Sequence, residues 1–140
     1  MALVTPNEGE LELLDKMLLD ALSVGEDSIL FLYNQNYTPI SSSTLTSFTT
    51  CTFTNHAART ITRAGWVAAS TVSNKATETY SSALSWTCGA TGDTAYGYFV
   101  KGASSGKVLW AEKFGTARTL ATGDILNLTP KFTLNDENNA

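Results

Sequence analysis

The first part of the chain carries apolar residues at helical spacing. In the segment TPNE, Thr5 is a candidate N-cap, Pro6 occupies the first helical position and Glu8 the third, which is the pattern of a capping box. Apolar residues then recur at helical spacing as far as Gly25, a residue suited to the left-handed conformation that ends helices. The pattern predicts an amphipathic helix over residues 5–24.

The apolar side of this helix is broad. Its apolar residues cover about half of the circumference, more than the stripe of roughly 100° that one packing surface fills. Leu19 adds an apolar residue on the polar side. Two interpretations are open: the helix is sunk deep in its own core, or it is shared with a partner chain. In the second interpretation Leu13, Met17 and Leu19 are candidate interface residues.

From residue 28 onward the hydrophobic period is two, and turn residues divide the chain into short segments. A hairpin is expected between FTTCTFT (48–54) and ARTITRAGWVAAS (58–70), with its turn near Asn55 and His56. Pro39 and Pro130 cannot donate to a central ladder, so each indicates an edge, a bulge or a strand end. The predicted strands are ILFLY (29–33), FTTCTFT (48–54), ARTITRAGWVAAS (58–70), ETYSSALSWTC (78–88) and ILNLTPKFTL (125–134).

The most aromatic part of the chain is predicted to form a further hairpin. YGYFVK and KVLWAEKF flank GASSG, a connection long enough for a G1 bulge or a looser loop. Both strands are apolar on both faces, so we expect a second sheet to cover one face and a neighbouring chain or a helix to cover the other. Strand alternation predicts that Tyr96, Tyr98 and Val100 lie on one face of the first strand and Phe99 on the other. In the second strand, Val108, Trp110 and Phe114 are predicted to share one face, and Leu109 and Ala111 the opposite face.

About eight short strands after one helix predict a mainly β fold. The expected architecture is an antiparallel β-sandwich or a jelly-roll-like domain with one N-terminal amphipathic helix. At 140 residues the chain suits a single domain over 1–140, with the sandwich over 28–134 and a mobile tail over 135–140.

Composition narrows the possible partners. Only 16% of the residues are charged, whereas roughly 25% is usual, and 21 threonines and 13 serines supply most of the polar surface. The net charge of −4 leaves no basic face for phosphates, so we expect no nucleic-acid partner. The sequence has no apolar run of about 18 residues and no basic, apolar leader at its start, so we expect no membrane span and synthesis in the cytoplasm without a signal peptide.

The two cysteines do not suggest a disulfide framework or a redox motif. Cys51 and Cys88 are too few for a secreted scaffold, and neither belongs to a C-x-x-C pair. We expect two buried free thiols, with a single disulfide between strands as the alternative.

The residues that could carry catalysis are few and scattered. The single histidine, His56, excludes a multi-histidine metal site, and the glycines have no phosphate-loop spacing. Nothing in the sequence brings the carboxylates Glu78, Asp93, Glu112 and Asp124 together as a glycosidase pair. We therefore expect no enzyme, no cofactor and no metal site.

Several aromatic patterns together resemble a known group of proteins. After the leucine-rich helix come LYNQNYTP, GW at 65 and 66, YGYFV, LWAEKF and LTPKFTL. Their order, over nearly the whole chain, resembles a group of small tailed-bacteriophage virion proteins. The resemblance implies a structural protein of the virus particle, either a decoration (cement) protein on the head or a small tail component. It carries over no catalytic residue.

On this resemblance, the expected function is capsid decoration. The expected location is the virion, on the capsid surface, and the expected partners are the major capsid protein and other copies of the chain in a homo-oligomer. The alternative is a tail or baseplate module that binds host glycans. Tyr96, Tyr98 and Trp110 are candidate contact residues in both cases: exposed parts would serve a protein contact in the first and stack on sugars in the second.

Overall fold

The computed structural model describes residues 3–9, 27–68, 70–72 and 75–134. Most of the predicted helix 5–24 lies outside these residues, as do the candidate interface positions Leu13, Met17 and Leu19 and the tail 135–140. Of the predicted helix, residues 7–9 are helical. Glu8 Oε1 accepts a 2.9 Å hydrogen bond from the backbone N–H of Val108, which ties this segment to the start of the strand at 108.

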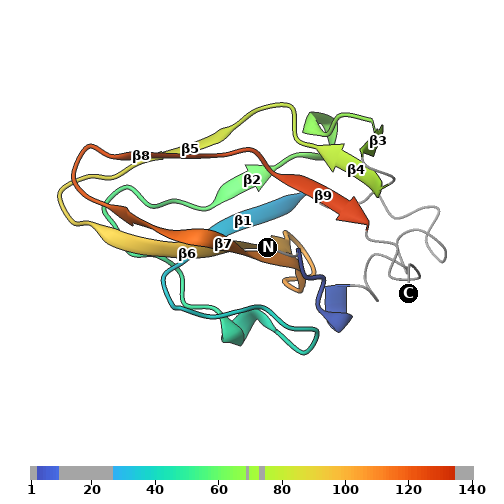
Figure 1. Cartoon of the computed structure of the whole chain (residues 1–140), viewed down its shortest axis with the longest axis horizontal. Coiled ribbons are helices and arrows are strands. Elements are labelled where there is room, and N and C mark those ends of the chain that lie inside the picture. Colours follow the sequence, from blue (N-terminus) through green and yellow to red (C-terminus); the bar gives the residue numbers. More distant parts are fainter. Residues whose placement is uncertain (1–2, 10–26, 69, 73–74, 135–140) are drawn as a thin grey trace.

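The described part of the chain is mainly β, and every strand pairing is antiparallel, which confirms the coarse fold prediction (Figure 1). The sheets have the strand orders β2-β1-β6-β7, β3-β4-β9 and β5-β8. Two short 3-10 helices, η2 (Leu45–Ser47) and η3 (Arg63–Gly65), lie in the connections. The strands are β1 (Ser28–Tyr33), β2 (Arg59–Ile61), β3 (Ser70–Val72), β4 (Lys75–Thr79), β5 (Leu84–Thr87), β6 (Asp93–Gly102), β7 (Val108–Leu120), β8 (Ile125–Leu128) and β9 (Lys131–Leu134).

The main core lies between the four-stranded sheet and the strands above it. In Figure 1 the β5-β8 pair runs over the four-stranded sheet, and β9 continues from β8 toward β3 and β4. Alternate side chains of each layer point into the space between them, where water is excluded. Buried members of this core include Leu30 and Leu32 from β1, Tyr98 and Val100 from β6, Trp110 from β7, Trp86 from β5 and Leu126 from β8.

A second, smaller cluster covers the opposite face of the four-stranded sheet. Phe99 stacks on Phe31 and on Phe48 with ring centroids 5.2 Å and 4.8 Å apart. Phe48 comes from the long β1–β2 connection, which passes below the sheet in Figure 1. The prediction that both faces of the aromatic hairpin are covered is confirmed. The sequence predicted a helix or a neighbouring chain as the cover of this second face. Part of the cover is instead the chain's own β1–β2 connection.

The predicted hairpin between 48–54 and 58–70 is wrong, although its turn is real. Thr50 pairs with Tyr33 of β1, and β2 pairs with residues 28–30 of β1. Both pairings are antiparallel and lie along the same edge of β1. The two segments therefore run in the same direction and cannot pair with each other. Asn55 adopts a positive φ of 73°, and the turn around it lies in the connection between the segments 48–54 and 58–70. Phe48 lies in the second cluster and Phe53 in the main core, so this segment passes from one face of the sheet to the other.

Two other predicted strands are each divided between sheets. Residues 78–88 supply the end of β4 and all of β5, and residues 125–134 supply β8 and β9. Pro130, buried between β8 and β9, has no N–H for a ladder, but its carbonyl accepts a 2.8 Å bond from Tyr80. The proline thus marks the point at which the chain passes from one sheet to the next.

The aromatic hairpin is confirmed as β6 and β7, but irregular pairing changes its faces. The register shifts between Ala95 and Gly97 and again between Val100 and Lys101. Each shift reverses the alternation of side chains. Tyr96 therefore packs against the second cluster, opposite Tyr98, and Val108 joins it, whereas Leu109 lies in the main core. The predicted faces of Tyr96, Val108 and Leu109 are wrong for this reason.

Candidate functional site

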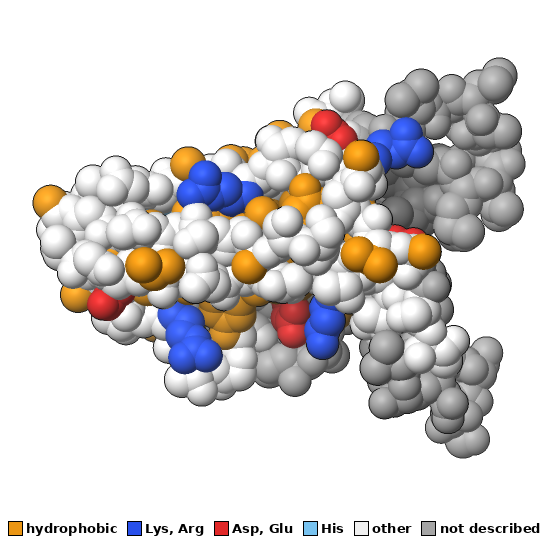
Figure 2. Space-filling view, turned by 90° about the horizontal axis from the view of Figure 1, so that it is seen from above, with side chains coloured by type: hydrophobic (Ala, Val, Ile, Leu, Met, Phe, Trp, Pro, Cys, Tyr) orange, Lys and Arg blue, Asp and Glu red, His pale blue; other side chains and the backbone are white. Residues whose placement is uncertain are grey.

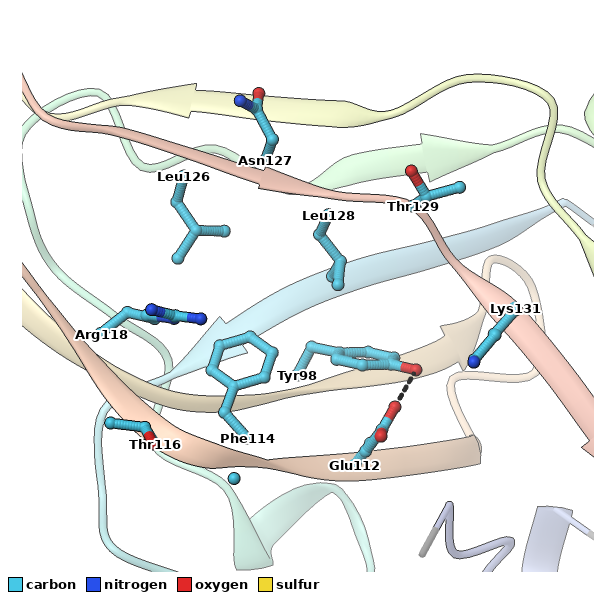
Figure 3. A pocket seen from close by; sticks show the side chains of 11 residues that line it. Tyr98, Glu112, Phe114, Thr116, Arg118, Leu126, Asn127, Leu128, Thr129 and Lys131 are labelled. Atoms are coloured by element: carbon cyan, nitrogen blue, oxygen red, sulfur yellow. Dashed lines mark hydrogen bonds between the residues drawn. The ribbon is translucent and has the colours of Figure 1, made fainter. Parts of the chain in front are cut away.

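A cleft of about 520 Å³ opens where three sheet edges meet. Strands β7, β8 and β9 each stand at the end of their sheet's strand order, and all three contribute to its walls (Figure 3). A free edge leaves part of the backbone of a strand without a ladder partner. The residues around the cleft are Tyr98, Glu112, Phe114, Gly115, Thr116, Arg118, Leu126, Asn127, Leu128, Thr129 and Lys131.

One end of the cleft contains a buried hydrogen bond between strands. Tyr98 and Glu112 are direct partners in the β6–β7 ladder, and the Tyr98 hydroxyl donates to Glu112 Oε2 at 2.9 Å (Figure 3). Burial of Tyr98, which is 2% exposed, raises its pKa well above the usual range, and the nearby charge and hydrogen bond of Glu112 raise it further. Trp110 slightly opposes this rise in pKa. Tyr98 is therefore a neutral donor at this end.

The cleft combines an apolar wall with two basic side chains. In Figure 3 Leu126 and Leu128 from β8 point toward Phe114 and Tyr98. Arg118 and Lys131 line opposite ends and are both exposed. Neither forms an ion pair within the described ranges. The electrostatics of the cleft thus provide for a ligand that carries a negative charge.

The cleft continues along the two edge strands as a groove. A second hollow of about 340 Å³ shares Arg118, Leu126 and Asn127 with the first and extends to Asp124 and Ile125. Figure 2 shows hydrophobic side chains recessed between basic and acidic ones along one long margin of the molecule. We call the two hollows together the β7–β8 groove.

The aromatic residues singled out in the sequence are mostly core residues. Trp110 is 5% exposed and packs edge-on against Trp66 and Phe132, with ring centroids 6.0 Å and 5.3 Å away. Among the described residues its indole N–H makes no hydrogen bond of normal geometry, although it is directed closely enough at the Tyr98 hydroxyl to lower the pKa of Tyr98 slightly. Tyr98 reaches the groove only at its wall, and Tyr96 is half-buried on the other face of the sheet. The three rings therefore do not form one exposed surface.

The single histidine and the cysteines also lie apart from the groove. His56 packs edge-on against Phe53 with ring centroids 5.1 Å apart, and burial lowers its pKa despite the nearby Asp93 charge. Cys51 and Cys88 are buried free thiols, which confirms the prediction made for them. Burial raises the pKa of Cys51 to about 12, and Asp93 adds to this shift. A thiol with such a pKa is a poor nucleophile near neutral pH.

Sequence reasoning did not find Arg118, Asn127 or Lys131. Each is a single polar residue within an otherwise apolar or threonine-containing segment, and no motif marks it. Asn127 and Lys131 lie in the last predicted strand, 125–134, whereas Arg118 lies between the predicted strand KVLWAEKF and the turn TGD that precedes that strand. The reversal of the chain at this turn brings Arg118 and Asn127 to opposite walls of one groove.

The described residues contain no second cluster of reactive side chains. In the described part of the chain, no three His, Cys, Asp or Glu side chains gather as metal ligands would. The same residues include no helix long and apolar enough to cross a membrane. No protein-family model matches the chain, and no curated protein matches it.

Proposed function

We propose that the protein is a non-enzymatic structural component of a bacteriophage particle. The proposed role is a decoration (cement) protein that binds and stabilises the assembled head through the major capsid protein and other copies of itself. The resemblance of LYNQNYTP, YGYFV, LWAEKF and LTPKFTL to small virion proteins supports the particle context. LYNQNYTP, YGYFV and LWAEKF lie in or next to β1, β6 and β7 of the four-stranded sheet.

The observation that carries a framework role is the use made of the carboxylates. Glu8, Asp27, Asp93 and Asp124 each accept a hydrogen bond from a backbone N–H of another residue, and Glu112 accepts one from Tyr98. The bonds of Glu8, Asp27 and Asp93 join segments far apart in the sequence, whereas Asp124 fixes a local turn. Carboxylates used in this way stabilise the fold, since hydrogen bonds to charged groups are stronger than neutral ones.

The arrangement of the sheets supports the finer fold assignment. Two β layers enclose one main core, with side chains of both inner faces packed together. This is the organisation of a β-sandwich or a jelly-roll-like domain. A threonine-rich sandwich with few charged residues and with free strand edges suits repeated binding at many equivalent positions on a capsid.

The proposal is tested on purified particles. Mass spectrometry should detect the chain in the virions, and a cryo-EM map should place it on the head surface. Purified protein should also rebind particles that lack it. Leu13→Glu and Leu19→Glu, which lie outside the described residues, should weaken rebinding, whereas Lys16→Glu on the predicted polar side should not. Absence of the chain from purified particles would reject the proposal.

The second candidate function is a tail or baseplate module that binds host glycans. The observation that favours it is the groove, where the Phe114 ring lies beside the Arg118 side chain (Figure 3). Sugars stack on aromatic rings and bond to such polar groups. Since Tyr98 and Trp110 are buried, Phe114 would supply the stacking surface. Binding on a glycan array without binding to heads would support this candidate over decoration.

A further inference from the structure

The β7–β8 groove has an unpaired strand edge on each side. Val4 exchanges two hydrogen bonds with Ala111, so the outward backbone groups of β7 are occupied at that point. Ladder groups alternate in direction along a strand, so the N–H and C=O of Lys113 point outward as those of Ala111 do. Within the described ranges, no strand pairs with β7 there.

The edge of β8 on the other side of the groove is also unpaired. The N–H of Cys88 donates to the carbonyl of Asp124, so Asp124 points its carbonyl toward the β5 side. Alternation then turns Leu126 toward β5 and the backbone of Asn127 away from it. Asn127 lines the groove, and no further described strand pairs with β8.

From these edges we infer that the groove binds an extended peptide segment of a partner polypeptide by β-strand addition. The molecule already uses this mode, because residues around Val4 add to the edge of β7 next to the groove. The inference goes beyond the proposed function and does not depend on where the protein acts.

The side chains define the chemistry of the segment. Phe114, Leu126 and Leu128 provide an apolar wall for every second side chain, as period-two alternation requires. Arg118 and Lys131 have no ion-pair partner in the described chain, and the two carboxylates of the groove, Glu112 and Asp124, accept hydrogen bonds from the Tyr98 hydroxyl and the Ala121 N–H. The two cations therefore favour a carboxylate at each end of the segment. The partner segment is therefore extended, alternately apolar, free of proline and flanked by Asp or Glu.

The experiment uses the full chain labelled with ¹⁵N and the peptide acetyl-Glu-Val-Thr-Val-Thr-Val-Glu-amide. Binding should shift the backbone amides of β7 beyond Lys113 and those of β8. Arg118→Glu should weaken binding about tenfold or more, since it replaces a charged hydrogen-bond donor with a repelling group. The matched control is Arg63→Glu, which makes the same charge change at an exposed position outside the groove and should leave binding unchanged.

Two further peptides separate strand addition from simple charge attraction. N-methylation of alternate residues removes the N–H donors along one edge of the peptide. One of the two possible N-methylated forms should lose binding and the other keep it. Equal binding by both forms, or by a peptide with lysine at both ends, would overturn the inference. Amide shifts that depend on protein concentration without any peptide would also overturn it, because they would assign the groove to a second copy of the chain. Amide shifts of the groove caused by glucuronic acid alone would overturn it as well.

Discussion

The hydroxyl of Tyr98 donates a 2.9 Å hydrogen bond to Glu112, its direct partner across the β6–β7 ladder. The pair thus joins the main core to the wall of the β7–β8 groove. An ionised acceptor makes such a bond stronger than a neutral one. The two residues are 14 positions apart in sequence, and the hairpin alone brings them together.

Tyr98→Phe should lower the free energy of unfolding by about 1 to 3 kcal/mol, because it leaves the Glu112 carboxylate without its donor while keeping the buried ring. Urea denaturation monitored by circular dichroism measures the loss. Tyr96→Phe is the matched control: it removes a hydroxyl from a half-buried ring on the other face of the sheet, and no described residue hydrogen-bonds to that hydroxyl. Equal losses in the two variants would contradict a special role for the Tyr98 hydroxyl.

Stability should fall steeply in alkaline solution. Burial raises the pKa of both Tyr33 and Tyr98 above the ordinary value of 10.0, and the charge of Glu112 adds to each shift. Above pH 10 the unfolded chain releases these phenol protons while the folded chain retains them. The free energy of unfolding therefore decreases as pH rises. Absorbance at the phenolate band should show these two tyrosines ionising only together with unfolding; their titration near pH 10 in the folded protein would refute this.

Asp93 should stabilise the junction between the β1–β2 connection and β6. Oδ2 accepts from the Thr52 backbone N–H at 2.7 Å and from Asn34 Nδ2 at 3.0 Å, and Oδ1 accepts from the Thr94 N–H at 2.8 Å. Asp93→Asn places an amide donor among these donors and should cost about 2 kcal/mol. Glu78→Gln, at an exposed position in β4, is the control and should change stability by less than about 0.5 kcal/mol.

The cost of Asp93→Asn should depend on pH in one direction. Burial raises the pKa of Asp93, but the hydrogen bonds from Thr52, Asn34 and Thr94 outweigh burial and hold it below 3.8. The stabilisation is therefore present above the unfolded pKa and is lost as pH falls through the folded value. The difference between parent and variant should shrink below about pH 4. A constant difference from pH 7 to pH 2 would show that the charge is not responsible.

Cys51 and Cys88 should react with an alkylating reagent only after unfolding. Both thiols are buried, and Cys88 Sγ lies within 3.5 Å and 3.6 Å of the carbonyl oxygens of Thr91 and Gly89. Mass spectrometry after alkylation before and then after denaturation measures the accessibility of each thiol. A crosslinked Cys51–Cys88 peptide as the main species would contradict the free-thiol state.

Local chemistry predicted the limits of elements better than their partners. The glycine-containing segment GASSG (102–106) correctly separated β6 from β7, because turns depend on residues close in sequence. The prediction for 48–54 failed since the pattern of Thr and Phe shows strand tendency but not which edge the segment joins. Tyr96 was placed on the wrong face because a bulge, invisible in the alternation, reverses the side chains after it.

The groove could be predicted only in part for the same reason. Tyr98 and Glu112 belong to one predicted hairpin, but the register that makes them direct partners includes a shift between Val100 and Lys101 that the sequence pattern did not predict. Arg118 and Asn127 meet across two different sheets, and this depends on the reversal at 121–124. There Gly123 has a φ of +88° and the N–H of Ala121 donates to the Asp124 carboxylate. The arrangement of two sheets is a tertiary property that single-residue patterns do not contain.

Gly97 should be the least replaceable glycine of the aromatic hairpin. A Cβ at this position would lie 2.2 Å from the carbonyl oxygen of Glu112 and 2.4 Å from the hydroxyl of the buried Tyr33. Neither neighbour can give way freely, because one is ladder backbone and the other a fully buried ring. Gly97→Ala should therefore cost about 1 to 3 kcal/mol, the usual range for overpacking a core.

Gly106 in the same hairpin separates this steric cause from backbone strain. Its φ is +68°, and nothing lies within 4 Å of a Cβ placed there. Gly106→Ala should cost about 1 kcal/mol through the left-handed conformation alone, and Gly106→Asn should recover most of that loss because Asn tolerates this conformation. Gly97→Asn should recover nothing, since the clash remains. Urea denaturation of the four variants gives the comparison, and a Gly97→Ala protein as stable as the parent would show that β6 and β7 are farther apart than the structure places them.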